Sequence, residues 1–177
     1  MMNTANEMNV AMNKIRKYSK TAKILSVVIA GLLLFAGVSL VAVMVVVGLY
    51  PEQFTEFLRD GAEQGLVNTP TAELLHEIAL GNEMALGTLH QEIIINAVQC
   101  ILSAAVMIIS AKLFGWIYKN GTPFHTHVVK QIKIIAVLLI VSGIFNLAMV
   151  LLGVVVYLLA QIFSYGVILQ QESDETL

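Results

Sequence analysis

Charged residues are scarce in this sequence, and only one cysteine is present. Asp, Glu, Lys and Arg make up 12% of the 177 residues, whereas 58% are hydrophobic. Ordinary globular domains carry about 25% charged residues, so the composition excludes a typical soluble domain. The single cysteine, Cys100, excludes an internal disulfide framework and says nothing about the redox compartment.

Motifs of enzymes are also missing. The sequence has no phosphate-binding loop, dinucleotide fingerprint, nucleophile elbow or pair of carboxylates suited to burial. No acidic residue falls within a long apolar run, which argues against a proton-coupled pump built on intramembrane carboxylates. We therefore expect neither enzymatic activity nor a bound cofactor.

Candidate metal ligands occur only as isolated pairs. Glu73 and His76 would share one face of a helix, and His125 and His127 are close in sequence. A closed zinc site needs more ligands than one pair supplies, so we expect no metal site. The first pair then forms a solvated acidic face, with an outward metal or pH-sensing site as the alternative. The second pair forms an exposed helix start.

Uncharged apolar runs are what the sequence has in quantity. They contain 28 residues (24–51), 19 residues (93–111) and 38 residues (134–171). A helix of about 20 residues crosses a bilayer core of about 30 Å, so each run can span at least once. The sequence predicts an all-α integral membrane protein with four transmembrane helices and a helical extracellular cap.

Basic and acidic residues are segregated along the chain. Nine of the ten Lys and Arg residues lie near the N-terminus or in and beside residues 119–133, while eight of the twelve acids lie between residues 51 and 92. The positive-inside rule then places the N-terminal segment and residues 119–133 in the cytoplasm and the acidic loop outside the cell membrane. With four spans the C-terminus also returns to the cytoplasm. The predicted boundaries are 1–23 for the basic segment, 24–50 for span 1, 51–90 for the external loop and 91–118 for span 2. They continue with 119–127 for a cytoplasmic turn, 128–150 for span 3, 154–171 for span 4 and 172–177 for a tail.

Two interpretations of the basic segment remain open. Met8, Met12, Ile15 and Ala22 share one helical face, opposite most of the Lys and Arg residues. This pattern is typical of an interfacial helix on an anionic leaflet. The favoured alternative is a topology anchor that continues into span 1.

The external loop predicts two short helices that lie as a cap on the membrane surface. Pro51 and Gly61 would bound the first helix, and Pro70 and Gly81 the second. An apolar patch is expected on the first helix, formed by Phe54, Phe57 and Leu58.

Small and polar residues indicate how the spans pack. Ser26, Ala30, Gly37 and Gly48 share one sector of span 1, and small residues let helices approach closely in lipid. A polar set is predicted to hydrogen-bond between helices of the bundle, with a hydrated pathway or ligand pocket as the alternative: Asn96, Gln99, Ser103, Asn146 and Gln161.

The cytoplasmic turn has clear local signals. Gly121 can stop span 2 through a positive φ, and Pro123 cannot continue a helix. Phe124 is expected to pack back against the bundle, and Thr126 to cap the next helix. The candidate partner surface consists of Gly121, Pro123, Phe124, Lys130 and Lys133.

The last apolar run allows two topologies. As one helix, residues 134–171 would measure about 57 Å, nearly twice the core thickness. Two spans joined by a turn near Leu151–Gly153 fit better. Three spans with one long last helix remain the alternative, because polar residues from Ser142 to Ser164 keep one helical phase.

The Gly121-x-Pro123-Phe124 motif and the end of the chain are similar to one known family. The matching positions at the end are Ala160, Phe163, Tyr165, Gly166, Leu169, Gln170, Glu172, Ser173 and Asp174. Over about residues 110–177 the chain resembles the bacterial family called domain of unknown function 2975, and the first half is similar only in its span pattern. The resemblance implies a small four-span membrane protein.

Two departures limit what the resemblance implies. After the phenylalanine, the family has a polar or acidic helix start and Arg-rich positions. This chain has His125, Thr126 and His127 there, followed by Lys130 and Lys133 only. Gln161 stands where relatives commonly have an acid, so a proton- or ion-linked role of that acid does not carry over.

The resemblance also implies a partner, since family members are often encoded beside a small helix-turn-helix DNA-binding regulator. We expect a membrane sensor or accessory protein that signals to such a cytosolic regulator. The lipid bilayer and a second copy of the chain are further expected partners, and direct nucleic-acid binding is not expected. An immunity or envelope-stress protection protein that acts through the cap is the alternative, and a small transporter that uses the polar set is a third hypothesis.

Overall fold

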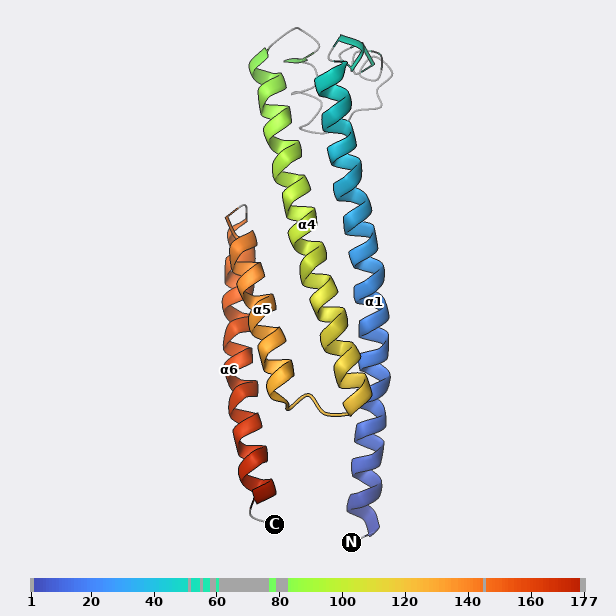
Figure 1. Cartoon of the computed structure of the whole chain (residues 1–177), viewed down its shortest axis with the longest axis vertical. Helices are drawn as coiled ribbons and strands as arrows, with labels where there is room; N and C mark the ends of the chain where they lie inside the picture. The colour runs from blue at the N-terminus through green and yellow to red at the C-terminus, as the bar shows by residue number, and fades with distance from the viewer. Residues whose placement is uncertain are drawn as a thin grey trace. The chain divides into compact units, whose positions relative to one another are not determined.

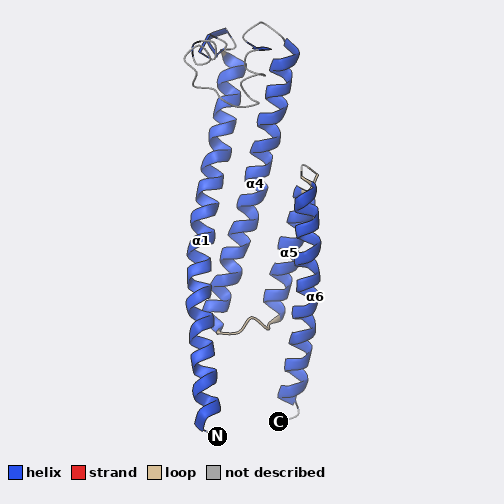
Figure 2. Cartoon of the chain, turned by 180° about the vertical axis from the view of Figure 1, so that it is seen from behind, coloured by secondary structure: helices blue, strands red, loops and turns tan. Residues whose placement is uncertain are grey.

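The computed structural model describes residues 2–50, 52–54, 56–57, 60, 77–78, 83–144 and 146–175 (Figure 1). The long helices in this part of the chain are α1 (Met2–Leu49), α4 (Glu83–Asn120), α5 (Thr126–Ser142) and α6 (Leu147–Glu175). No strand occurs among the described residues (Figure 2). The predicted all-α fold class is confirmed.

Three of these helices are long and apolar enough to cross a bilayer: Asn9–Leu49, Met84–Asn120 and Leu147–Ser173. Their outward faces carry large apolar side chains, such as Phe35 of α1 and Ile162 of α6. Such faces are stable only against lipid or another apolar surface. The chain is therefore a multi-pass helical membrane protein. The 17-residue α5, about 25 Å long, is not among the three.

The chain divides into two compact units. The bundle unit contains Met1–Leu33 and Ile101–Leu177, and the loop unit contains Leu34–Cys100. The bundle unit therefore holds α5, α6 and one part each of α1 and α4, and the loop unit holds the other parts of α1 and α4. Both α1 and α4 continue from one unit into the other as unbroken helices.

The basic segment and span 1 form one continuous helix, α1. In the bundle unit this helix is drawn without a sharp bend (Figure 1). An interfacial helix lying in the membrane plane would need such a bend, so the topology anchor that continues into the span is the interpretation that agrees with the structure.

The predicted packing face of α1 is buried at three of its four positions. Ser26, Ala30 and Gly37 are buried, whereas Gly48 is exposed and nothing lies within 4 Å of where its Cβ would be. The prediction is wrong for Gly48, because in the last turn the buried position is Val47. Contact positions drift around a straight helix, since about 3.6 residues per turn does not divide a seven-residue repeat.

Helices α5 and α6 pack closely as an antiparallel hairpin. A Cβ on Gly153 would lie 2.7 Å from Ile140 Cγ1 and 2.9 Å from the Ala136 carbonyl oxygen. Ala136 and Ala160 have no exposed surface. Small residues allow this close approach, which is how helices gain packing energy in lipid.

The turn between α5 and α6 lies at residues 143–146, not near Leu151–Gly153 as predicted. The Gly143 N–H bonds to the Leu139 and Ile140 carbonyl oxygens at 3.1 and 3.0 Å, and Asn146 Oδ1 accepts the Ala148 N–H at 3.0 Å. These bonds satisfy backbone groups at both helix ends. The predicted limits 128–150 and 154–171 are therefore replaced by the helices 126–142 and 147–175. A single helix over residues 134–171 is also wrong, whereas three of the described helices, one of them Leu147–Ser173, are long and apolar enough to cross a bilayer.

The loop unit has its own apolar core. Ile78, Ala85, Leu89 and Ile93 are buried there, and Leu40, Met44, Phe54 and Leu86 pack against them. Of the predicted apolar patch, Phe54 joins this core and Phe57 is 72% exposed. Leu58 lies outside the described residues.

Only part of the predicted cap is described. Residues 52–54, 56–57, 60 and 77–78 are helical, in agreement with two short helices. The positions proposed to bound these helices, Pro51, Gly61, Pro70 and Gly81, lie outside the described residues, as do Glu73 and His76. Helix α4 begins at Glu83, before the predicted start of span 2.

Candidate functional site at the turn between α4 and α5

Helix α4 ends at a glycine with a left-handed backbone. Gly121 has φ of 74°, and its N–H bonds to the Ile117 carbonyl oxygen at 2.8 Å. The Asn120 side chain donates to the Trp116 carbonyl oxygen at 2.9 Å. A positive φ strains residues that carry a Cβ, so glycine ends this helix at little conformational cost.

Two basic side chains of α1 lie along glycines at the end of α4. Arg16 Nε is 3.4 Å from the position of a Cβ on Gly121, and Lys23 Cδ is 3.4 Å from that on Gly115. The aliphatic stem of Lys23 thus lies against Gly115, and the guanidinium of Arg16 lies against Gly121. Cations are also favoured beside the partly negative C-terminal end of a helix. The basic segment of α1 is thereby brought beside the turn between α4 and α5.

His125, not Thr126, is the N-cap of α5. Its backbone is extended, with φ of −149° and ψ of 144°, and its Nδ1 accepts the His127 N–H at 3.1 Å. Thr126 is the first helical residue, where it cannot provide the cap. The predicted cap was one residue late, because an imidazole nitrogen replaces the usual side-chain oxygen.

Trp116 lies beside both histidine rings of the turn. The ring centroids are 4.6 Å apart for Trp116 and His125 and 5.9 Å apart for Trp116 and His127. His127 Nε2 is also 2.9 Å from Gln131 Nε2. No group of three or more His, Cys, Asp or Glu in the described part of the chain could hold a metal ion. These rings hold the start of α5 against the end of α4.

Phe124 packs on α6. Its ring centroid is 5.6 Å from that of Phe163, and a Cβ on Gly166 would be 3.0 Å from two atoms of the Phe124 ring. The two stretches that carry the family resemblance are therefore in contact with each other. This contact also brings the last part of α6 back to the turn.

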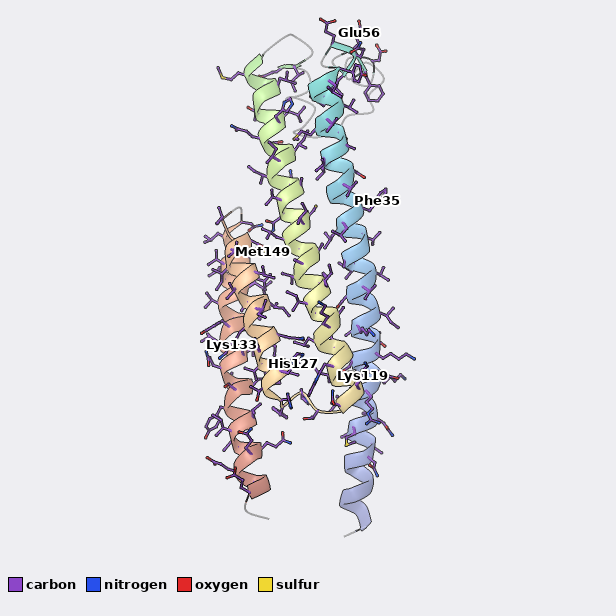
Figure 3. All side chains as sticks on the ribbon, in the orientation of Figure 1. Phe35, Glu56, Lys119, His127, Lys133 and Met149 are labelled. Carbon is purple, nitrogen blue, oxygen red and sulfur yellow. The ribbon has the colours of Figure 1, made fainter. Side chains whose placement is uncertain are left out.

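The five residues of the predicted partner surface differ in exposure. Phe124 and Lys130 are exposed, and Gly121 is buried. Pro123 and Lys133 are half-buried, and Lys133, which Figure 3 labels, belongs to α5. Phe124 and Lys130 are thus the most accessible to a partner, whereas Gly121 shapes the turn.

The predicted polar set is distributed over both units. In the loop unit Asn96 is exposed and Gln99 is half-buried; the buried Gln99 Oε1 accepts no hydrogen bond among the described residues. In the bundle unit Ser103 is half-buried, Asn146 lies in the turn and Gln161 is exposed on α6. Neither Asn146 nor Gln161 belongs to the buried contacts of the hairpin, because both side chains are exposed. The Asn146 side chain instead caps α6.

No protein-family model, curated protein or solved structure matches this chain. The resemblance described above therefore stays an expectation, and the functional argument depends on the geometry of the turn.

Three residues of the turn region were not predicted from the sequence: Arg16, Lys23 and Trp116. Arg16 and Lys23 are seven positions apart, close to the spacing of Gly115 and Gly121. The similar spacing indicates a pair of contacts only once α1 and α4 are known to be antiparallel neighbours.

Proposed function

We propose that this chain is a four-span sensor or accessory protein that signals to a cytosolic regulator of the helix-turn-helix type. The observation that carries the proposal is the convergence of three segments at the turn between α4 and α5. Arg16 of α1 lies against Gly121, and Gly166 of α6 lies against Phe124. A shift of α1 or α6 would thus change the contacts of the turn, and with them the surface that a partner binds.

The hairpin of α5 and α6 supports the four-span topology. Residues 147–166 of α6 measure about 30 Å, the thickness of the hydrocarbon core. Helix α5 measures about 25 Å, and the four residues from Gly143 to Asn146 add to its reach. In this topology α5 is a short third span, and the residues 143–146 face the outside.

Charge supports the sidedness. Lys119, Lys130 and five basic residues of α1 belong to the bundle unit, and both termini lie at the same end of it (Figure 1). By the positive-inside rule that end is cytoplasmic. The regulator then binds on the cytoplasmic side, where Phe124 and Lys130 are accessible.

Signal transfer would use the unbroken helices. Helix α1 extends from the basic segment to Leu49, and α4 extends from Glu83 to Asn120. These two helices lead from the external loop in sequence to residues that form or contact the turn, so the proposal assigns the transfer of the signal to them. The signal itself would be an external ligand or a change in the bilayer.

Crosslinking in native membranes tests this proposal. A DNA-binding regulator is expected to be captured with the wild-type protein, and much less with a Lys130→Gln, Lys133→Gln double variant. The matched control is Lys14→Gln, Lys17→Gln, which removes the same charge from α1 and should leave capture unchanged. Absence of any such regulator from the wild-type capture would refute the proposal.

A further inference from the structure

We propose that the outward face of the basic segment of α1 binds anionic lipid headgroups, mainly through Lys17 and Lys20. This surface is distinct from the residues of the turn that the proposed function uses. It does not require a cytosolic regulator.

The lysines occupy the side of α1 that faces away from its helical neighbours. Ser19 and Ser26 are buried and Ile15 is half-buried, which defines the inner side. At about 100° per residue, Lys17 lies opposite that side, and Lys14 and Lys20 flank Lys17. All three lysines are exposed.

The same outward side continues directly into lipid-facing residues. Ile24 lies two turns after Lys17 on the same side, followed by Val28, and these side chains are 55% and 53% exposed. Lys23 contacts the Gly115 position next to Trp116, and tryptophan is enriched at the membrane interface. The border of the hydrocarbon core therefore lies near Lys23.

The distance of each lysine from the border of the hydrocarbon core determines how strongly it can interact with lipid headgroups. At about 1.5 Å per residue, Lys20 is about 4–5 Å, Lys17 about 9 Å and Lys14 about 13–14 Å beyond Lys23. The headgroup layer is about 5–8 Å thick on each side, and the surface potential decays over about 8–10 Å at physiological salt. Lys20 thus lies within the layer, Lys17 at its edge and Lys14 beyond it.

Charge and surface chemistry favour lipid over an acidic protein as the occupant. No acidic residue lies on α1 between residues 9 and 49; the acids of the bundle unit are Glu7, before that stretch, and those near the end of α6, Glu172, Asp174 and Glu175. A protein that covered both the lysines and Ile24 would have to enter the hydrocarbon core. An anionic lipid satisfies both parts of the surface, with its phosphate at the lysines and its acyl chains at the aliphatic side chains.

Energy transfer from tryptophan measures this binding in the intact protein. Trp116 is the only tryptophan, so it serves as the donor in phosphatidylcholine nanodiscs that contain a small fraction of dansyl-labelled phosphatidylglycerol or dansyl-labelled phosphatidylcholine. Wild-type protein is expected to transfer more strongly to the anionic probe, and the difference should shrink as salt is raised.

Substitutions along one helix face provide matched controls. Lys20→Gln should lower the preference for the anionic probe about fivefold, which corresponds to about 1 kcal/mol for a lysine near the surface. Lys14→Gln makes the same chemical change farther from the bilayer and should lower it by about twofold or less. Equal transfer to both probes in the wild type would overturn the proposal, as would equal losses for Lys14→Gln and Lys20→Gln. Regulator capture is a separate readout, so either proposal can fail alone.

Discussion

At the scale of single residues, glycines in this chain have three different roles. Gly121 provides a positive φ that ends α4, and Gly115 lies in contact with the Lys23 stem. Gly31 has no atom within 4 Å of a Cβ position and lies exposed within α1. The same residue type thus predicts different consequences of substitution at each place.

Gly121→Ala should destabilise the protein, whereas Gly31→Ala should not. Alanine at Gly121 would have a left-handed backbone, which costs about 1–2 kcal/mol, while its Cβ would only be in ordinary contact with Arg16, at 3.4 Å. Alanine at Gly31 should stabilise α1 by about 0.5–1 kcal/mol, because glycine is unfavourable within a helix. Thermal unfolding in detergent, followed by circular dichroism, measures both changes. Equal stability of the two variants would contradict the role assigned to Gly121.

The turn at Gly121 was predictable because its signals are local. Asn120-Gly121 and Pro123 determine the backbone without any information from other helices. The partners of that turn were not predictable, because Arg16 and Phe163 reach it only through the packing of α1 and α6. His125 was also missed as a cap, since histidine is not among the residues preferred there.

At the scale of elements, the α5 and α6 hairpin shows how one glycine can suggest the wrong boundary. Gly153 appeared to mark a turn, but it lies within α6 and allows close contact with α5. The true turn depends on Gly143 and Asn146, whose hydrogen bonds are local. A glycine in an apolar run marks either a turn or a close contact, and periodicity alone does not distinguish them.

Gly153→Ala should therefore destabilise the hairpin. Its Cβ would lie 2.7 Å from Ile140 Cγ1 and 2.8 Å from the Ile140 backbone nitrogen, and overpacking of this kind typically costs about 1–3 kcal/mol. Gly48→Ala is the control, because nothing lies within 4 Å of its Cβ position. The melting temperatures of both variants in the same detergent test this prediction, and that of Gly153→Ala should be the lower. A stability of Gly153→Ala equal to that of wild type would show that the helices can separate freely.

At the scale of the whole molecule, the all-helical class and the apolar character of the helices followed from composition, while the pairing of the helices did not. The predicted membrane class depended on uncharged run length, which is a property of the sequence alone. The return of α6 to the turn depends on the contact of Phe124 with Gly166. That contact joins residues far apart in the sequence, and no local pattern indicates it.

Cysteine accessibility tests the proposed four-span topology. In a Cys100→Ala background, Ile144→Cys should react with a membrane-impermeant maleimide in intact cells, because Ile144 is 79% exposed in the turn assigned to the outside. Ser173→Cys should react only after the cells are permeabilised. Labelling of Ser173→Cys from outside would refute the cytoplasmic tail, and protection of Ile144→Cys would show that α5 does not cross the bilayer.

The continuity of α1 and α6 beyond the turn restricts the shape of any partner. From the contact of Arg16 with Gly121, α1 continues through residues 2–15 for about 21 Å, and from Gly166 α6 continues through residues 167–175 for about 13 Å. At this end of the bundle unit, α1 and α6 thus both extend beyond the turn between α4 and α5. If the proposed regulator binds at this turn, we expect it to reach Phe124 with a narrow element, such as a loop tip or a single helix, and not with a flat face.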